Sequence, residues 1–304
     1  MSKWSKMRLT FRKVFTRETT VNLLFILPSL ILVGYFVYVL IGWNVVVSLS
    51  DWKGLTPSYN IIGFGQYVTL FQDPEFITSL TNNLILILLF VPSSLALGLF
   101  LAILLDSKVR GEGVFRNIYL LPFSLSFVIT ATLWLWMYNP KVGVINTLLR
   151  AIGLGFLQPG WTTDPNIALV CVVLAIVWQF SGYTMLIFSA GIKSIPESQV
   201  MAAEVDGASG FNLYRRVIIP QLKAPALNAF VVLMVFALKV FDFIYVFTEG
   251  GPGHSTYVLP LLMFRNTFRM NQYSSGAAIA TLLFLLAFVI VVPYMYLSSR
   301  REKD

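Results

Sequence analysis

Six long apolar stretches constrain this chain more than any other feature of its sequence. A helix needs about 20 apolar residues to cross the roughly 30 Å hydrocarbon core of a bilayer. Stretches of that length occur at Val21–Ser48, Asn83–Leu105, Ile118–Met137, Ala168–Ile192, Leu227–Phe247 and Ser275–Leu297. We therefore predict an all-α, polytopic membrane protein with six transmembrane helices, forming a single transmembrane domain over residues 1–304.

The number and the placement of charged residues agree with this prediction. Charged residues make up 12% of the chain, whereas a soluble domain carries about 25%, so a soluble globular protein is excluded. The 22 Lys and Arg outnumber the 14 Asp and Glu, and most of them lie in the N-terminal segment 1–20 and in alternate connections between the spans. By the positive-inside rule, both termini are expected in the cytoplasm. Membrane topology thus accounts for the basic excess, and we expect no nucleic-acid partner.

Residues that support hydrolytic, metal or nucleotide chemistry are scarce. His254 is the one histidine and Cys171 the one cysteine, and the chain has no P-loop motif. A histidine- or thiolate-based metal site therefore cannot form, and ATP phosphates cannot be bound in the P-loop manner. His254 lies in a polar external loop, where we expect it to be solvated. We expect no cofactor and no enzymatic activity on this chain.

The cytoplasmic connection 194–220 has the signals of an ordered helix–turn–helix. Pro196 suits the first turn of a helix, which we predict over Glu197–Val205. That helix should end at Gly207, which permits a left-handed cap, and a second helix should run from Ser209 to the boundary at Pro220. Several small residues would let another protein approach this backbone closely: Ala202, Ala203, Gly207 and Ala208. From the residues alone, both a partner-docking role and a structural re-entrant knuckle fit.

Within this connection, residues 201–208 read Met-Ala-Ala-Glu-Val-Asp-Gly-Ala, and Ile-Ile-Pro follows at 218–220. The pattern resembles the E-A-A-x-x-D-G-A and I-x-L-P motifs of permease subunits in binding-protein-dependent ABC importers. Residues 115–122 look like the segment of that family that enters the third span. Residues 134–140 and 242–252 are similar to its carbohydrate-uptake branch, the maltose/glycerol-phosphate type. Because these motifs recur in order over nearly the whole chain, the resemblance implies the type I (MetI-like) ABC importer permease fold.

The same resemblance implies a function and a set of partners. The chain would be the membrane-spanning subunit of an ATP-driven importer that moves a sugar or related polyol across a bacterial or archaeal plasma membrane by alternating access. Its partners would be a second homologous permease subunit, two ATP-binding subunits that hydrolyse the nucleotide, and an external solute-binding protein. Contact with the ATP-binding subunits would involve Glu197, Met201, Ala202, Ala203, Glu204, Asp206, Gly207 and Ala208.

One position departs from the family pattern. Met201 stands where the family has a glutamate that helps to seat this helix on the ATP-binding subunit. Glu204 lies about 60° around the helix from position 201 and is a candidate substitute. The departure implies a more apolar contact at this position.

Two groups of residues are candidates for the solute path. Gln179 and Tyr183 are four residues apart and share a helix face, where they would contact either the solute or a neighbouring helix. The resemblance implies that four positions of the fifth span face the cavity: Leu233, Phe236, Ala237 and Val240.

The fifth span also contains two residues of opposite charge, Lys239 and Asp242. Because a charge in lipid is costly, we expect them to form a structural ion pair. A continuous helix would place this pair roughly 100–180° away from the cavity-facing positions. An alternative is that the pair serves as the proton or cation relay of an ion-coupled secondary transporter. A membrane scaffold with no transport activity is a third possibility.

Overall fold

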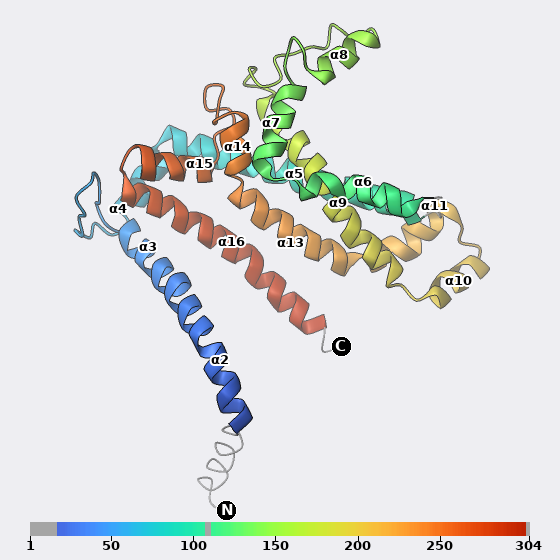
Figure 1. Ribbon diagram of the computed structural model, residues 1–304, viewed down its shortest axis with the longest axis horizontal. Coiled ribbons are helices and arrows are strands. Elements are labelled where there is room, and N and C mark those ends of the chain that lie inside the picture. Colours follow the sequence, from blue (N-terminus) through green and yellow to red (C-terminus); the bar gives the residue numbers. More distant parts are fainter. Residues whose placement is uncertain (1–16, 107–110, 302–304) are drawn as a thin grey trace, which may run out of the picture.

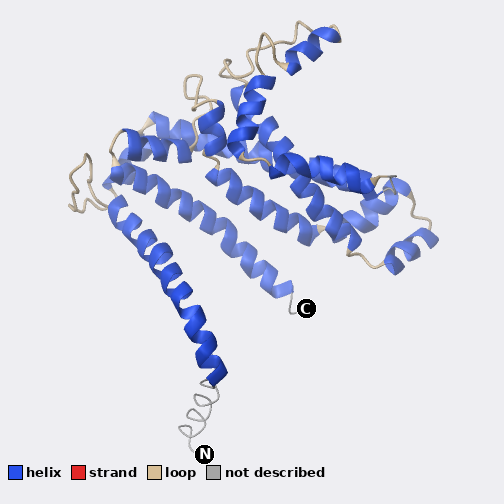
Figure 2. Ribbon diagram, in the orientation of Figure 1, coloured by secondary structure: helices blue, strands red, loops and turns tan. Residues whose placement is uncertain are grey.

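The computed structural model describes residues 17–106 and 111–301, with the side chains of 17–20 and 296–301 left out of the description. Residues 1–16 of the predicted cytoplasmic segment 1–20 therefore lie outside it. Within the described residues, regular structure is helical (Figure 2), apart from one isolated bridge between Ser50 and Ile61. The predicted all-α class is confirmed.

Four of the predicted spans are long helices. They are the continuous run α2–η1–α3 (Arg17–Val33, Gly34–Val39, Leu40–Ser48), α5 (Pro74–Asp106), α9 (Ala168–Lys193) and α16 (Tyr273–Arg301). A helix satisfies its backbone hydrogen bonds internally, as the bilayer core requires. The first run projects away from the rest of the molecule in Figure 1, and its side chains from 21 to 40 are almost all exposed.

The other two predicted spans are bent, so a straight helix over Ile118–Met137 or Leu227–Phe247 is wrong. The first is divided into α6 (Glu112–Ser124) and α7 (Phe127–Met137), which are inclined at 100°. The second is divided into α13 (Lys223–Lys239) and α14 (Asp242–Phe247). A further bend of 66° separates α13 from the preceding helical segment that ends at Gln221. By length and composition, the described residues thus contain four spans, or six if α6 with α7 and the segment 210–221 with α13 each count as one.

Side chains from other helices form hydrogen bonds to the backbone at both breaks. At the first, Leu125 and Ser126 are extended, and the Gln179 amide donates to the Leu125 carbonyl at 3.0 Å. At the second, the Asn83 amide donates to the Ala237 carbonyl at 3.2 Å. The amide oxygen of Asn83 accepts from the backbone of Leu259, at the start of α15 (Leu259–Phe264), at 2.8 Å. The backbone groups that the breaks expose are therefore partly satisfied.

The main packing contact joins α5 and α9. A side-chain carbon at Gly98 would overlap Thr184, whose hydroxyl instead donates to the Ser94 carbonyl at 2.9 Å. Small residues of this kind let transmembrane helices approach closely. A large buried cluster surrounds Phe90 and Phe243, and a smaller one joins the ends of α5 and α9 to residues 213–222.

The shorter elements are α4 (Gly65–Gln72), α8 (Val144–Ala151) and η3 (Arg265–Arg269). Pro74–Leu80 forms the first turns of α5. Asp73 accepts from the Glu75 backbone at 2.9 Å and starts the helix. The hydroxyl of Thr78 donates back to the Pro74 carbonyl, so the polar residues here do not interrupt the helix.

Candidate functional site

The connection 194–220 folds as its sequence predicts. Helix α10 covers Glu197–Val205, and Gly207 adopts a φ of +88°. The Ala208 amide bonds to the Ala203 carbonyl at 2.9 Å, and the Gly207 amide to the Glu204 carbonyl at 3.0 Å. These two bonds form a Schellman cap, which requires the left-handed residue. A second helical segment follows, built of α11 (Gly210–Leu213), η2 (Tyr214–Ile218) and α12 (Ile219–Gln221).

The connection 194–220 packs one face against the membrane domain and leaves the other face exposed. Leu213 and Ile218 are buried in the smaller core cluster, and Val200 packs against it. On the open side, the exposed fraction is 88% for Val205 and 74% for Phe211. In Figure 1, α10 and α11 lie at one extremity of the molecule. Val205 and Phe211 are therefore accessible to a partner protein.

The predicted coupling residues lie on α10 and its cap. Ala203 and Ala208 are half-buried against the membrane domain, and the other six are exposed: Glu197, Met201, Ala202, Glu204, Asp206 and Gly207. Met201 and Glu204 are both exposed. Glu204 is therefore accessible to take the role that a glutamate at position 201 has in the family. Their contact with a partner stays a prediction.

Two polar contacts that we did not predict lie in this region or directly before it. The Tyr214 hydroxyl donates to the Asp106 carboxylate at the end of α5, at 2.7 Å. The Lys193 ammonium at the end of α9 pairs with Glu112 of α6 at 2.8 Å, and Glu112 also pairs with Arg116. The sequence carries no signal for the first contact, because its partners are 108 residues apart.

A second candidate region is a cavity of about 380 Å³ beside the break between α13 and α14. Its lining is mostly aromatic and aliphatic: Phe127, Val232, Val235, Phe236, Lys239, Val240, Phe241, Asp242 and Phe243. Phe236 and Val240 line this cavity, whereas Leu233 and Ala237 are fully buried in the larger core cluster. A contact of these four residues with solute stays a prediction.

The expected ion pair between Lys239 and Asp242 does not form. Among the described residues, neither side chain takes part in an ion pair. Helix α13 ends at Lys239, and Val240 has a ψ of 90°, so the two residues no longer lie three apart on one helix. The helical-wheel placement was wrong for the same reason, since both residues line the cavity with Phe236.

Gln179 and Tyr183 make contacts between helices. Gln179 is 1% exposed, and its amide bonds to Leu125 as described above. The Tyr183 ring stacks on Phe123, with centroids 5.1 Å apart. These contacts correspond to the helix–helix alternative, and a contact with solute stays a prediction.

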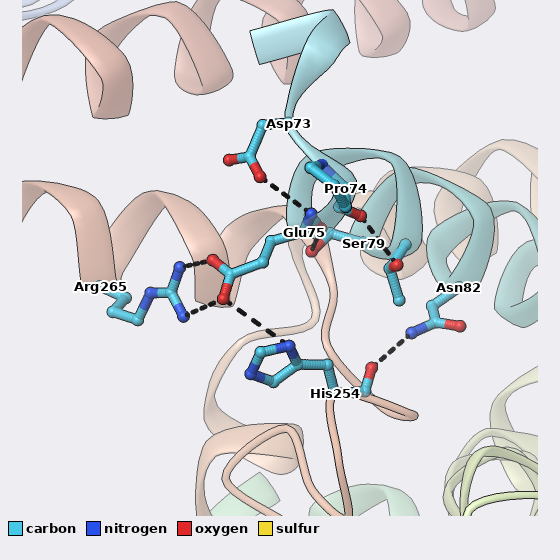
Figure 3. A network of polar contacts seen from close by, with 8 residues as sticks. Asp73, Pro74, Glu75, Ser79, Asn82, His254 and Arg265 are labelled. Atoms are coloured by element: carbon cyan, nitrogen blue, oxygen red, sulfur yellow. Dashed lines mark hydrogen bonds and ion pairs between the residues drawn. The ribbon is translucent and has the colours of Figure 1, made fainter.

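A polar network fastens the start of α5 to the loop after α14 (Figure 3). Glu75 forms an ion pair with Arg265, and the His254 ring nitrogen lies 3.7 Å from the same carboxylate. The Asn82 amide donates to the His254 carbonyl at 3.1 Å. The hydrogen bond to Glu75 raises the pKa of the Arg265 guanidinium. His254 is thus not simply solvated, because a carboxylate faces its ring.

Potential metal ligands do not gather in the part of the chain that the structure describes. No group of three or more His, Cys, Asp or Glu residues there is placed to hold an ion. Cys171 is buried.

Comparison with known proteins places this architecture among transporters. A solved structure of a bacterial ABC transporter that imports alginate matches with a TM-score of 0.81 over 96% of this chain and 98% of that one, at 24% identity. A probable ABC transporter permease of Pyrococcus horikoshii is 59% identical over 92% of this chain and 96% of its own length. The xylose/arabinose import permease of Haloferax volcanii is 45% identical over 88% of this chain and 84% of its own.

A trehalose/maltose transport system permease of Thermococcus litoralis is 32% identical over 95% of this chain and 97% of its own length. The family model described as the inner membrane component of binding-protein-dependent transport systems matches residues 94–303. That match includes the bent spans, the cavity and α10. The chain therefore belongs to the family of inner membrane components of binding-protein-dependent transport systems.

Proposed function

We propose that this chain is the membrane-spanning subunit of an ATP-driven importer of a sugar. The observation that carries the proposal is the folded segment 197–221, which presents exposed apolar residues to a partner while its other face is buried in the membrane domain. The xylose/arabinose and trehalose/maltose permeases among its relatives support a sugar as the solute.

The proposed assembly contains a second homologous permease subunit, two ATP-binding subunits and an external solute-binding protein. The related alginate transporter has been solved in complex with a periplasmic protein that holds an alginate pentasaccharide. Both termini and α10 would face the cytoplasm of the cell, with the chain inserted in the plasma membrane. Lys and Arg placement supports this orientation.

Coupling follows from the contacts of α10. When the ATP-binding subunits close, they would push the face that carries Val205 and Phe211. The Tyr214–Asp106 hydrogen bond would pass that displacement to α5, and the buried Ile218 would pass it to the smaller core cluster. Both α5 and the smaller core cluster lead toward the cavity beside α13. One displacement of α10 would therefore change how accessible that cavity is.

Reconstitution tests the proposal directly. The full complex is placed in liposomes with its solute-binding protein outside and ATP inside, and labelled arabinose, xylose, maltose and trehalose are offered one at a time. We expect accumulation of at least one sugar that requires ATP. Uptake that follows an imposed proton gradient and ignores ATP would instead support the ion-coupled carrier, and no uptake of any sugar would refute the proposal.

A further inference from the structure

Lys239 and Asp242 are unpartnered charges at a break in a membrane helix. Neither forms an ion pair or side-chain hydrogen bond with any residue that the structure describes. Both are exposed and line the same cavity. Ionisable residues at membrane depth pair with each other, or else they face a water-filled cavity and mark a solute or ion pathway. No pairing forms among the described residues of this chain, which favours the second role.

The fold fixes the backbone at these two residues before any solute arrives. Val240 between them is extended, and the Asn83 amide fixes the preceding turn through the Ala237 carbonyl. Asn83 itself is 1% exposed and also bonds to the backbone of Leu259. The break is thus maintained by buried contacts, and preorganisation of this kind is typical of binding sites.

The rest of the cavity lining identifies what the two charges would bind. Apart from Lys239 and Asp242 it consists of apolar side chains, with the Phe127 and Phe236 ring centroids 4.9 Å apart. A carboxylate accepts hydrogen bonds from hydroxyls and an ammonium donates them, while aromatic rings pack against the carbon face of a sugar. The two charges cancel, so a neutral solute leaves no net charge in the cavity.

We propose that Lys239 and Asp242 contact the solute in this cavity and select for a neutral sugar. The inference rests on the proposed import function and adds the residues that recognise the solute within the membrane. A charged sugar would be attracted by one of the two residues and repelled by the other, so it would leave an uncompensated charge in a cavity whose other lining residues are apolar.

The test uses the reconstituted complex and the labelled sugar that the unmodified complex accumulates. Asp242→Asn and Lys239→Met should each lower uptake about tenfold, the effect of losing one charge-assisted hydrogen bond. ATP hydrolysis stimulated by the loaded solute-binding protein should stay unchanged. The matched control is Glu249→Gln, which removes another exposed carboxylate that lies outside the cavity and pairs with Arg269. It should transport normally.

A double variant separates solute contact from mutual bracing. Exchanging the two charges, Lys239→Asp with Asp242→Lys, would restore uptake if the residues only braced each other, and it should not do so here. In a Cys171→Ala background, a cysteine introduced by Asp242→Cys should react with a negatively charged thiol reagent more slowly when the sugar is present.

The outcomes distinguish the two proposals. Normal uptake by the single variants, rescue by the exchange, or a thiol reaction that the sugar does not slow would each overturn the selectivity role while leaving import intact. Failure of the unmodified complex to accumulate sugar would refute the import function, and this inference with it. Equal recovery of each variant in the purified complex guards against a folding defect.

Discussion

Replacing Gly207 by valine tests whether the cap of α10 is needed for coupling. Gly207 has a φ of +88°, and a Cβ there would meet no atom within 4 Å. The cost of the change is therefore a backbone cost, about 1–2 kcal/mol for a left-handed non-glycine residue and at the upper end for a β-branched one. That amount lowers the ratio of capped to uncapped forms by a factor of roughly 5–30. Docking of the ATP-binding subunit should weaken by up to the same factor.

Asparagine at the same position is the matched control. It resembles valine in size, but it tolerates the left-handed conformation. We expect Gly207→Asn to retain the ATP-binding subunit during purification and to show hydrolysis stimulated by the loaded solute-binding protein, whereas Gly207→Val loses most of both. Valine and asparagine variants that behave alike would refute the argument from backbone conformation. Wild-type values in both would remove the coupling role of the cap.

Four further expectations follow from other contacts. Tyr214→Phe removes the hydroxyl bonded to the end of α5 and should cost about 1 kcal/mol of stability, measured as a lower denaturation temperature of the complex with reduced stimulated hydrolysis. Gly98→Val inserts methyl groups into the closest approach of α5 and α9 and should destabilise the fold by about 1–3 kcal/mol, seen as poor recovery after detergent extraction. A cysteine introduced by Ser198→Cys should be labelled only from the cytoplasm, and one introduced by Thr56→Cys only from outside. The opposite pattern would refute the proposed orientation. Hydrogen bonds from Ser58 and Asn60 lower the pKa of the Asp51 carboxyl below its ordinary value of 3.8. Its contribution to the order of the loop 49–64 is therefore complete above that pH and is lost as the pH falls further. The protection of the loop amides, measured as exchange relative to the intrinsic rate at each pH, should fall there, and Asp51→Asn should abolish that loss.

Local signals in the sequence were sufficient for some elements. Pro196 and Gly207 define the bounds of α10 within a few residues of chain, and the structure has the predicted bounds. The long apolar runs likewise predict α9 and α16, because length and hydropathy alone determine a span.

The breaks in the third and fifth spans depend on distant residues. Leu125 is held by Gln179, and Ala237 by Asn83, which is 154 residues away. The apolar sequence continues across both breaks, so a hydropathy profile does not show them. The error at the second break carried over to Lys239 and Asp242, because their expected pairing assumed an unbroken helix.

Asn83 has a consequence for how the cavity can open. A single amide joins three segments: its own helix α5, the last turn of α13 and the first residue of α15. A rigid tilt of α13 must therefore carry α5 and α15 with it, or break two buried hydrogen bonds at about 1–3 kcal/mol for each group left unpaired. A pivot near the 66° bend before Lys223 would leave both hydrogen bonds intact, and the three segments joined by Asn83 would then move as one body.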